Sequence, residues 1–354
     1  MAAYESSSSD SEFHGENAED LSYADLETLP DCLLSRAHEL RALQLDHNNI
    51  SVLPPTVSIF NRLIVLDISN NNLSHISDEI IKLKQLRTFT ARNNRLEEQS
   101  LPKDFGLLKS LEVVNFSGNI FETLPPQLAE LRRLKCLYLG GNRIHELPHT
   151  IRNLTRLQVL YLGGNQLTDI PAEIGYMHSL TALVLCDNQL QSLPPTMIHL
   201  QRLQSLTLHN NQLSTLPTEI VSLNLVELSL RNNPLVKRFV QDLVYNPPTL
   251  LELSGRCVKI EKVNYTSHDL PENLIRYLDS AQRCVNPKCK GVYFTSRVEH
   301  IKFVDFCGKY RLPLLQYLCS PSCTTLKPTV CGASSDSDSD VDDARHRMRR
   351  VLLG

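Results

Sequence analysis

The sequence predicts an α/β solenoid, in which short repeated units stack side by side to share one core. A motif of the form L-x-x-L-x-L-x-x-N-x-L recurs nine times between residues 40 and 235. Its asparagines recur with a period of about 23 residues, lengthened once by an insertion at positions 97–100 and shortened slightly at the last step. A fixed period of this kind is typical of repeat architectures. The consensus asparagines are Asn48, Asn71, Asn94, Asn119, Asn142, Asn165, Asn188, Asn211 and Asn233.

Each repeat should contribute one short strand at its L-x-L segment, where alternate side chains face opposite ways. The leucines of one repeat cannot be buried alone, so neighbouring repeats must stack. The asparagine amide should point inward and satisfy backbone groups of adjacent turns. Prolines such as Pro148 and Pro171 should end the extended segment and lead into a looser or helical return. The expected fold is a leucine-rich-repeat horseshoe with a parallel sheet on its concave side.

The organisation of the chain follows from where this period starts and stops. Residues 26–30 carry a degraded repeat suited to cap the stack, and two Ser- and Asp-rich stretches are expected to be disordered. The predicted segments are an acidic tail at 1–20, an N-terminal cap at 21–39, nine repeats at 40–235, a helical cap at 236–278, a cysteine-rich module at 279–326, and an acidic then basic tail at 327–354.

Composition excludes several classes of function. A net charge of -3 over 354 residues gives no argument for nucleic-acid binding. The apolar runs are too short to cross a membrane, and the Ser-rich start does not resemble a secretory leader. We therefore expect a protein of the cytoplasm, and also of the nucleus, whose ten cysteines are thiols or metal ligands.

The middle of the concave face should be apolar and bind a protein substrate. Outward positions are polar in the outer repeats but apolar in the central ones, and an apolar patch with a polar rim marks an interaction site. Glycines at 140, 141, 163 and 164 are expected to leave a shallow pit beside it. The alternative is that Val and Tyr simply suit strands. The expected substrate-binding residues are Val113, Cys136, Tyr138, Val159, Tyr161, Ala182, Val184, Cys186, His209 and Arg231.

Helices are expected after the repeats. A short amphipathic helix is predicted at Lys237–Tyr245. A second should begin at Thr249, a helix-capping residue after two prolines, and a third near Pro271. The apolar face of the second helix, at positions i, i+3, i+4, i+7 and i+8, comprises Leu250, Leu253, Ser254, Cys257 and Val258.

These two later helices resemble the boxes of cullin-RING substrate receptors. The second helix resembles an elongin-binding box, whose positions are filled by Thr249, Leu250, Ser254 and Val258. Ser254 stands at the small-residue position, which is usually Cys or Ala in such boxes. The third helix resembles a cullin-selecting box, more in its cullin-2 than in its cullin-5 form. The matching residues are Leu270, Pro271, Leu274 and Leu278.

The chain as a whole is distantly similar to the leucine-rich-repeat substrate receptors of elongin B/C–cullin (cullin-2-type) RING ubiquitin ligases. That resemblance implies contacts to elongin C through Leu250 and Leu253, and a substrate on the concave face. Two alternatives remain open. Leu250, Leu251 and Leu253 could simply bury against the last repeat, or the solenoid could be a signalling scaffold for a small GTPase or a phosphatase.

Four cysteines near the C-terminus predict one structural zinc ion. Cys284-x4-Cys289 and Cys319-x3-Cys323 are two closely spaced pairs at the two ends of one segment, and two pairs of thiolates can surround zinc tetrahedrally. The alternative is four buried free thiols. Cys307, Cys331 and His300 are reserve ligands. A closed thiolate site has no place for a catalytic water, and no phosphate loop or hydrolase motif occurs, so we expect a non-enzymatic protein.

Overall fold

The computed structural model describes residues 17–235, 247–266, 268–286, 289–306, 310–324 and 350–352. The chain forms two compact units. The first comprises residues 1–213, 219–234 and 346–354, and the second comprises residues 214–218 and 235–345. The predicted helix at 237–245 lies outside the described residues.

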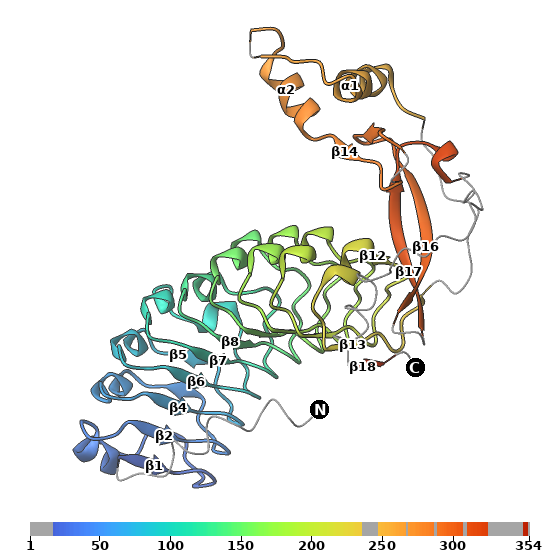
Figure 1. Ribbon diagram of the computed structural model, residues 1–354. Coiled ribbons are helices and arrows are strands. Elements are labelled where there is room, and N and C mark those ends of the chain that lie inside the picture. Colours follow the sequence, from blue (N-terminus) through green and yellow to red (C-terminus); the bar gives the residue numbers. More distant parts are fainter. Residues whose placement is uncertain are drawn as a thin grey trace. The chain divides into compact units, whose positions relative to one another are not determined.

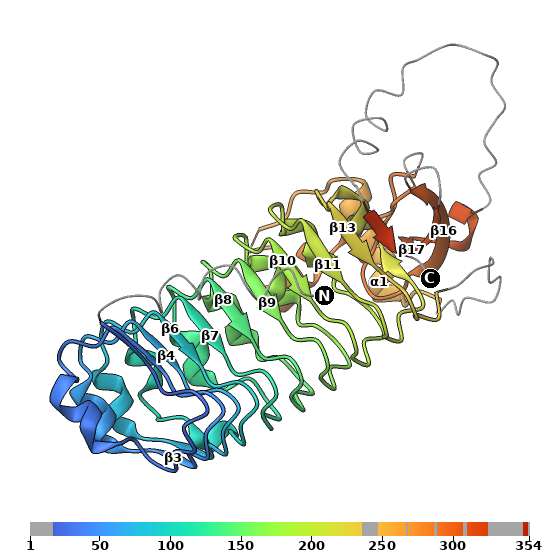
Figure 2. The same ribbon diagram turned by 90° about the horizontal axis from the view of Figure 1, so that it is seen from below.

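The first unit is built on one sheet of eleven parallel strands, as the repeat period predicts. Each strand pairs in register with the next, so the central leucines of neighbouring repeats, such as Leu137, Leu160 and Leu183, lie side by side. The strands line one face of the unit (Figures 1 and 2). They are β1 (Ala18–Asp20), β2 (Ala42–Gln44), β4 (Val65–Asp67), β6 (Thr88–Thr90), β7 (Val113–Asn115), β8 (Cys136–Tyr138), β9 (Val159–Tyr161), β10 (Ala182–Val184), β11 (Ser205–Thr207), β13 (Glu227–Ser229) and β18 (Arg350–Leu352).

The opposite face carries short 3-10 helices (Figure 1). Pro148 and Pro171 stand directly before two of them in an extended conformation, because proline fixes φ and lacks the N–H that a helix start would leave unpaired. The short strands β3 (Val52–Leu53) and β5 (His75–Ile76) pair beside this face. The 3-10 helices span Asp31–Arg36, Pro55–Ile59, Asp78–Lys82, Glu98–Ser100, Phe105–Leu107, Pro126–Glu130, His149–Asn153, Ala172–Tyr176, Pro195–His199 and Thr218–Ser222.

The consensus asparagines form an internal ladder, as expected. The Asn142 amide nitrogen donates to the carbonyls of Phe116 at 3.1 Å and Leu139 at 2.9 Å, while its oxygen accepts from the Phe121 N–H at 3.1 Å. Asn142 is 7% exposed. Since buried backbone groups must find partners, each asparagine joins two repeats that would otherwise leave such groups unpaired.

The residue before each consensus asparagine has a positive φ, which the sequence analysis did not predict. Gly141 and Gly164 stand here with φ of 65° and 70°, so these glycines meet a backbone requirement. The other occupants are His47, Asn70, Asn93, Gly118, Asp187, Asn210 and Asn232. The column could have been found from the sequence, since most of its members are Gly, Asn or Asp, the residues that tolerate this conformation best.

Two predicted tails are partly wrong. Residues 18–20 form β1, which pairs with β2, because the repeat sheet extends into the region expected to be disordered. Residues 350–352 form β18, which pairs with β13 at the other end of the sheet. The rest of both tails lies outside the described residues, apart from Asn17.

The second unit combines helices with an antiparallel hairpin. The predicted helices are α1 (Leu250–Ile260) and α2 (Glu272–Asp279). The hairpin consists of β16 (Val298–Phe306) and β17 (Tyr310–Leu318), which the sequence analysis missed. The remaining elements are β12 (Leu216–Pro217), which pairs with β17, the antiparallel pair β14 (Gln282–Arg283) and β15 (Val292–Tyr293), and a 3-10 helix at Pro321–Thr324.

Candidate functional site: an exposed helix and a repeat sheet

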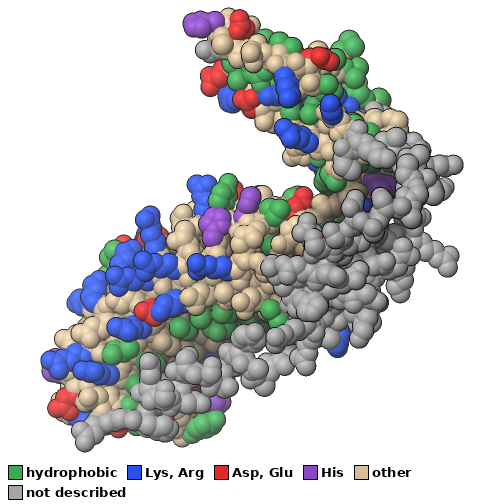
Figure 3. All heavy atoms as spheres, in the orientation of Figure 1, with side chains coloured by type: hydrophobic (Ala, Val, Ile, Leu, Met, Phe, Trp, Pro, Cys, Tyr) green, Lys and Arg blue, Asp and Glu red, His purple; other side chains and the backbone are tan. Residues whose placement is uncertain are grey.

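Helix α1 exposes its apolar face and buries its polar one. Thr249 caps the helix by accepting a hydrogen bond from the Glu252 N–H at 3.2 Å, as predicted. Leu250 is 85% exposed, Leu251 53% and Leu253 44%, and Figure 3 shows hydrophobic side chains among charged ones at the surface of this helical region. Within the second unit these leucines are therefore left largely uncovered.

The buried face of α1 is held by an ion pair. Glu252 is 1% exposed and receives the Arg256 guanidinium at 2.6 Å. Burial alone would raise the pKa of Glu252, but Arg256 and donors from the 294–296 segment lower that pKa to about 2. Those donors are the N–H groups of Phe294 at 3.1 Å and Ser296 at 2.9 Å and the hydroxyl of Thr295 at 3.0 Å.

Packing around Gly255 adds to this attachment. A side chain at Gly255 would meet the rings of Phe294 at 3.1 Å and Tyr277 at 3.3 Å, and these two rings stack with centroids 4.4 Å apart. This anchor was not predicted from the sequence. The sequence feature that could have revealed it is a Glu and an Arg four residues apart, which is the spacing of an ion pair on one helix face.

The elongin-box and cullin-box residues differ in exposure. Ser254 is exposed and bonds back to the Leu251 carbonyl at 2.9 Å, whereas Val258 is half-buried. Leu270 and Leu274 are half-buried and Pro271 is exposed. Leu278 is only 6% exposed, so it packs within the second unit and offers little surface.

The four predicted zinc ligands come together. The sulfur atoms of Cys284, Cys289, Cys319 and Cys323 all lie within 4.8 Å of one another. The Sγ of Cys319 is 3.4 Å from that of Cys289 and 3.6 Å from that of Cys323. Thiolates about 2.3 Å from zinc lie about 3.8 Å apart in a tetrahedron, so the cluster fits this ion. Four such thiols in a small apolar cluster could hold a metal ion.

Two further observations concern these cysteines. The Gly291 N–H donates to the Cys289 sulfur at 3.3 Å, and a side chain at Gly291 would stand 2.5 Å from the Cys319 sulfur, so glycine is required here. Of the reserve ligands, His300 lies on β16 outside the cluster. Cys307 and Cys331 lie outside the described residues.

The predicted concave residues fall in three columns of equivalent repeat positions. Cys136 pairs with Val159, and Tyr138 pairs with Tyr161, whose rings lie 6.3 Å apart. We call the eight neighbouring residues the apolar stripe. Six of them are half-buried, whereas Ala182 is 5% and Cys186 2% exposed and contribute little surface. The stripe consists of Val113, Cys136, Tyr138, Val159, Tyr161, Ala182, Val184 and Cys186.

The shallow pit expected beside the stripe is absent from these described repeats. A side chain at Gly140 would stand 2.2 Å from the Tyr161 ring, and one at Gly163 would stand 2.8 Å from the Cys186 sulfur. The space left by these glycines is therefore filled by side chains of the next repeat. This part of the prediction was wrong because glycine here admits a neighbour instead of opening a hollow.

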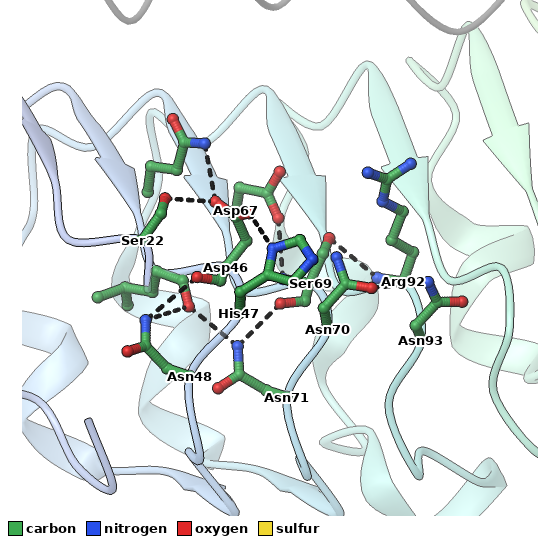
Figure 4. A network of polar contacts seen from close by, with 12 residues as sticks. Ser22, Asp46, His47, Asn48, Asp67, Ser69, Asn70, Asn71, Arg92 and Asn93 are labelled. Carbon is green, nitrogen blue, oxygen red and sulfur yellow. Dashed lines mark hydrogen bonds and ion pairs between the residues drawn. The ribbon is translucent and has the colours of Figure 1, made fainter. Parts of the chain in front are cut away.

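Beyond the stripe, the first repeats present a polar network (Figure 4). Asp46 accepts hydrogen bonds from Ser22 at 2.5 Å and Gln44 at 2.7 Å. Asp67 accepts from the Ser69 N–H at 2.9 Å, but burial raises its pKa. At the other end, His209 is half-buried and Arg231 is exposed. The stripe therefore has polar neighbours at both ends.

Repeat, sheet and stripe together define a leucine-rich-repeat protein. Family models for a leucine-rich repeat region and for leucine-rich repeats match residues 39–165, 156–177 and 178–235. Over 96% of its length the chain is 55% identical to leucine-rich repeat-containing protein 58 of Xenopus tropicalis, covering 98% of that protein. The human protein of that name is 58% identical over 93% of each chain. The chain belongs to the leucine-rich repeat-containing protein 58 family.

Solved structures share the repeat unit. The Arabidopsis receptor kinase HAESA, solved with the peptide hormone IDA and the co-receptor SERK1, matches with a TM-score of 0.54 and 30% identity, over 62% of this chain and 39% of that chain. The ectodomain of the receptor kinase GASSHO1/SCHENGEN3 from Arabidopsis thaliana matches with a TM-score of 0.50 and 30% identity, over 58% of this chain and 25% of that chain. Within the described part of this chain, every helix is too short or too polar to cross a bilayer.

Proposed function

We propose that the protein is a non-enzymatic substrate receptor of an elongin B/C–cullin RING ubiquitin ligase in the cytoplasm and nucleus. The exposed apolar face of α1 is the observation that carries this proposal. A leucine that a partner covers gains about 1.5–3 kcal/mol from burial, so Leu250, Leu251 and Leu253 form a favourable contact surface for elongin C.

The way α1 is attached supports the same function. Glu252 and Arg256 hold the helix from its polar side, which leaves the apolar side available without any unfolding. A rigid, preformed face avoids the ordering cost that weakens association. An amphipathic helix presented in this way is a common mode of protein recognition.

The segment that resembles a cullin-selecting box supports a cullin contact, but through three residues instead of the four predicted from the sequence. Leu270, Pro271 and Leu274 keep accessible surface, whereas Leu278 is buried. Cullin-2 is the favoured partner and cullin-5 the alternative. The client protein would bind the apolar stripe, with His209 and Arg231 as polar contacts at one end.

Affinity purification of the full chain tests the ligase proposal. Leu250→Asp combined with Ser254→Phe should reduce recovery of elongin B/C and of the cullin by at least about tenfold, since a buried charge and a bulky ring oppose the contact. Val263→Asp is the matched control, because Val263 is also exposed, at 53%, but lies beyond the helix. Unchanged elongin recovery with the double variant would disprove the proposal.

We also propose that Cys284, Cys289, Cys319 and Cys323 hold one structural zinc ion. The sulfur spacing supports zinc, and a small unit gains folding free energy from such an ion. Elemental analysis should find one zinc ion per chain fewer in Cys323→Ser than in the wild-type protein. Four free thiols in freshly purified, metal-free protein would contradict this proposal.

The second candidate function is a signalling scaffold that binds a small GTPase or a phosphatase. The paired rings of Tyr138 and Tyr161 on the sheet favour it, because Tyr is enriched at protein interfaces. Wild-type protein that captures no elongin, but captures such a partner in a manner lost with Tyr138→Ala and Tyr161→Ala, would favour the scaffold.

A further inference from the structure

The repeat unit contains a second cluster of ligand-type atoms, separate from the four cysteines. The Cys186 sulfur, an Asp187 carboxylate oxygen and a His209 ring nitrogen all lie within 4.8 Å of one another. Cys186 and His209 occupy equivalent positions of adjacent repeats, each two positions beyond the paired ends of β10 and β11. The repeat period therefore brings them to the same edge of the sheet.

The spacing of these atoms suits a metal ion. Asp187 Oδ2 lies 3.8 Å from His209 Nε2. Ligand atoms about 2.0–2.3 Å from zinc are about 3.3–3.8 Å apart in a tetrahedron. This separation is too long for a hydrogen bond between the two groups, but a cation between them could contact both.

The atoms that face away from the cluster are already engaged. The Asn210 amide donates to Asp187 Oδ1 at 2.5 Å, and His209 Nδ1 lies 3.3 Å from the Ser229 hydroxyl. Metal-binding His and carboxylate groups are typically oriented by such outer partners. Because Oδ1 and Nδ1 have these outer partners, Oδ2 and Nε2, which lie 3.8 Å apart, are the candidate ligand atoms.

We propose that Cys186, Asp187 and His209 form a zinc site with three protein ligands at the edge of the repeat sheet. Sulfur, nitrogen and oxygen ligands in combination suit zinc. Three protein ligands leave one position of the tetrahedron for water or for a side chain of a bound protein. This site does not depend on the elongin contact of α1 or on the four-cysteine cluster, although Cys186 and His209 also belong to the surface proposed to bind the client.

Zinc would replace the proton of the Cys186 thiol. Because the metal binds the thiolate, zinc binding releases this proton and the affinity rises with pH.

The sharpest test replaces one ligand without changing the backbone. Asp187 has a φ of 54°, a conformation that Asn also tolerates, and Asn can still accept the hydrogen bond from Asn210. Asp187→Asn should therefore keep the fold and lose one zinc ion per chain in a titration with zinc sulfate against a chromophoric chelator. His145→Ala, at an exposed histidine elsewhere on the repeats, should retain the wild-type zinc stoichiometry.

Cys186→Ser and His209→Gln should lose the same ion, and Co²⁺ loaded in its place should show a weaker thiolate charge-transfer band in Cys186→Ser. All four variants should recover elongin B/C as the wild type does, so that failure here is distinguishable from failure of the ligase proposal. Equal zinc stoichiometry in the wild type and in Asp187→Asn, with thermal stability unchanged, would overturn the site.

Discussion

The guanidinium of Arg256 on α1 donates a 2.8 Å hydrogen bond to the main-chain carbonyl of Cys319. Arg256 also donates to the Ser296 carbonyl and to Glu252. One side chain thus joins the helix with the exposed leucines to a member of the four-cysteine cluster. The position of the helix within the second unit depends on the conformation of that cluster.

Metal removal should therefore loosen α1. In zinc-loaded full-length protein, EDTA should increase hydrogen exchange in residues 284–323 and also in Leu250–Ile260, and should reduce elongin B/C capture. The first repeats have their own core, lie far along the chain from both proposed metal sites, and should be unaffected. EDTA saturated beforehand with zinc is the control. Unchanged exchange in α1 after metal loss would show that the helix is held without the cluster.

Replacing Arg256 by Lys should weaken the same attachment while keeping the charge. Lysine cannot reproduce the planar fork that reaches Cys319, Ser296 and Glu252 together, and disrupting a buried ion pair costs about 3–5 kcal/mol at most. We expect faster hydrogen exchange across α1 and weaker elongin B/C capture. Arg276→Lys, at an exposed residue of α2 with 74% side-chain exposure, is the control and should behave as wild type.

Acid should act on the anchor through Glu252. Its pKa is lowered from 4.5 to about 2, so the folded state favours the carboxylate. The resulting stabilisation is complete above about pH 5 and is lost as the pH falls toward 2. A ¹³C NMR titration of the Glu252 carboxyl should show its midpoint well below 4.5. A midpoint near 4.5 would mean that the ion pair with Arg256 is not formed.

The stability of the repeat unit should fall when one consensus asparagine of the ladder is replaced. Asn142→Ala removes the amide oxygen that accepts from the buried Phe121 N–H. It also removes one of the two asparagine donors to each of the Phe116 and Leu139 carbonyls, which keep Asn119 and Asn165. An unpaired buried group costs about 1–3 kcal/mol and the weakened carbonyls add to this, so the free energy of unfolding should fall by about 2–4 kcal/mol in urea denaturation. Asn153→Ala, at an exposed asparagine, should change the stability little. Equal losses in the two variants would contradict the role of the ladder.

Gly141 should tolerate asparagine better than alanine. A Cβ here would meet only backbone atoms at 3.5 Å or more, so space is not the constraint. Its φ of 65° costs an ordinary L-residue about 1–2 kcal/mol, whereas Asn adopts this conformation more readily. Thermal unfolding should rank wild type first, Gly141→Asn second and Gly141→Ala third. Alanine ranking above asparagine would contradict this explanation.

The repeat fold could be predicted from the sequence because its determinants are local and periodic. Each leucine and each asparagine recurs at a fixed spacing, so the strands, their register and the inward amides follow from one pattern. The 3-10 returns were less predictable, since a short segment after a proline can take several compact conformations. The positive-φ column was visible in the sequence but is not part of the leucine motif.

The second unit was harder to predict because its contacts join distant residues. The four cysteines were recognisable from their spacing, and Thr249 from its position before the helix. The burial of Glu252 by residues 294–296, far along the chain, follows no local pattern. For the same reason the sequence assigned 236–278 and 279–326 to separate segments, whereas helix α1 and the hairpin region belong to one unit.

The column of positive φ limits how the repeat surface can change. Gly, Asn and Asp are the residues that tolerate its backbone best, yet they differ in charge and in hydrogen-bonding capacity. A change from Asn to Asp at any repeat therefore introduces an acidic group at the sheet edge while the coil keeps its path. Asp187 is the instance in this chain, with Asn210 and Asn232 beside it. Acidic groups can therefore be gained or lost in this column, one repeat at a time, without a change in the backbone conformation.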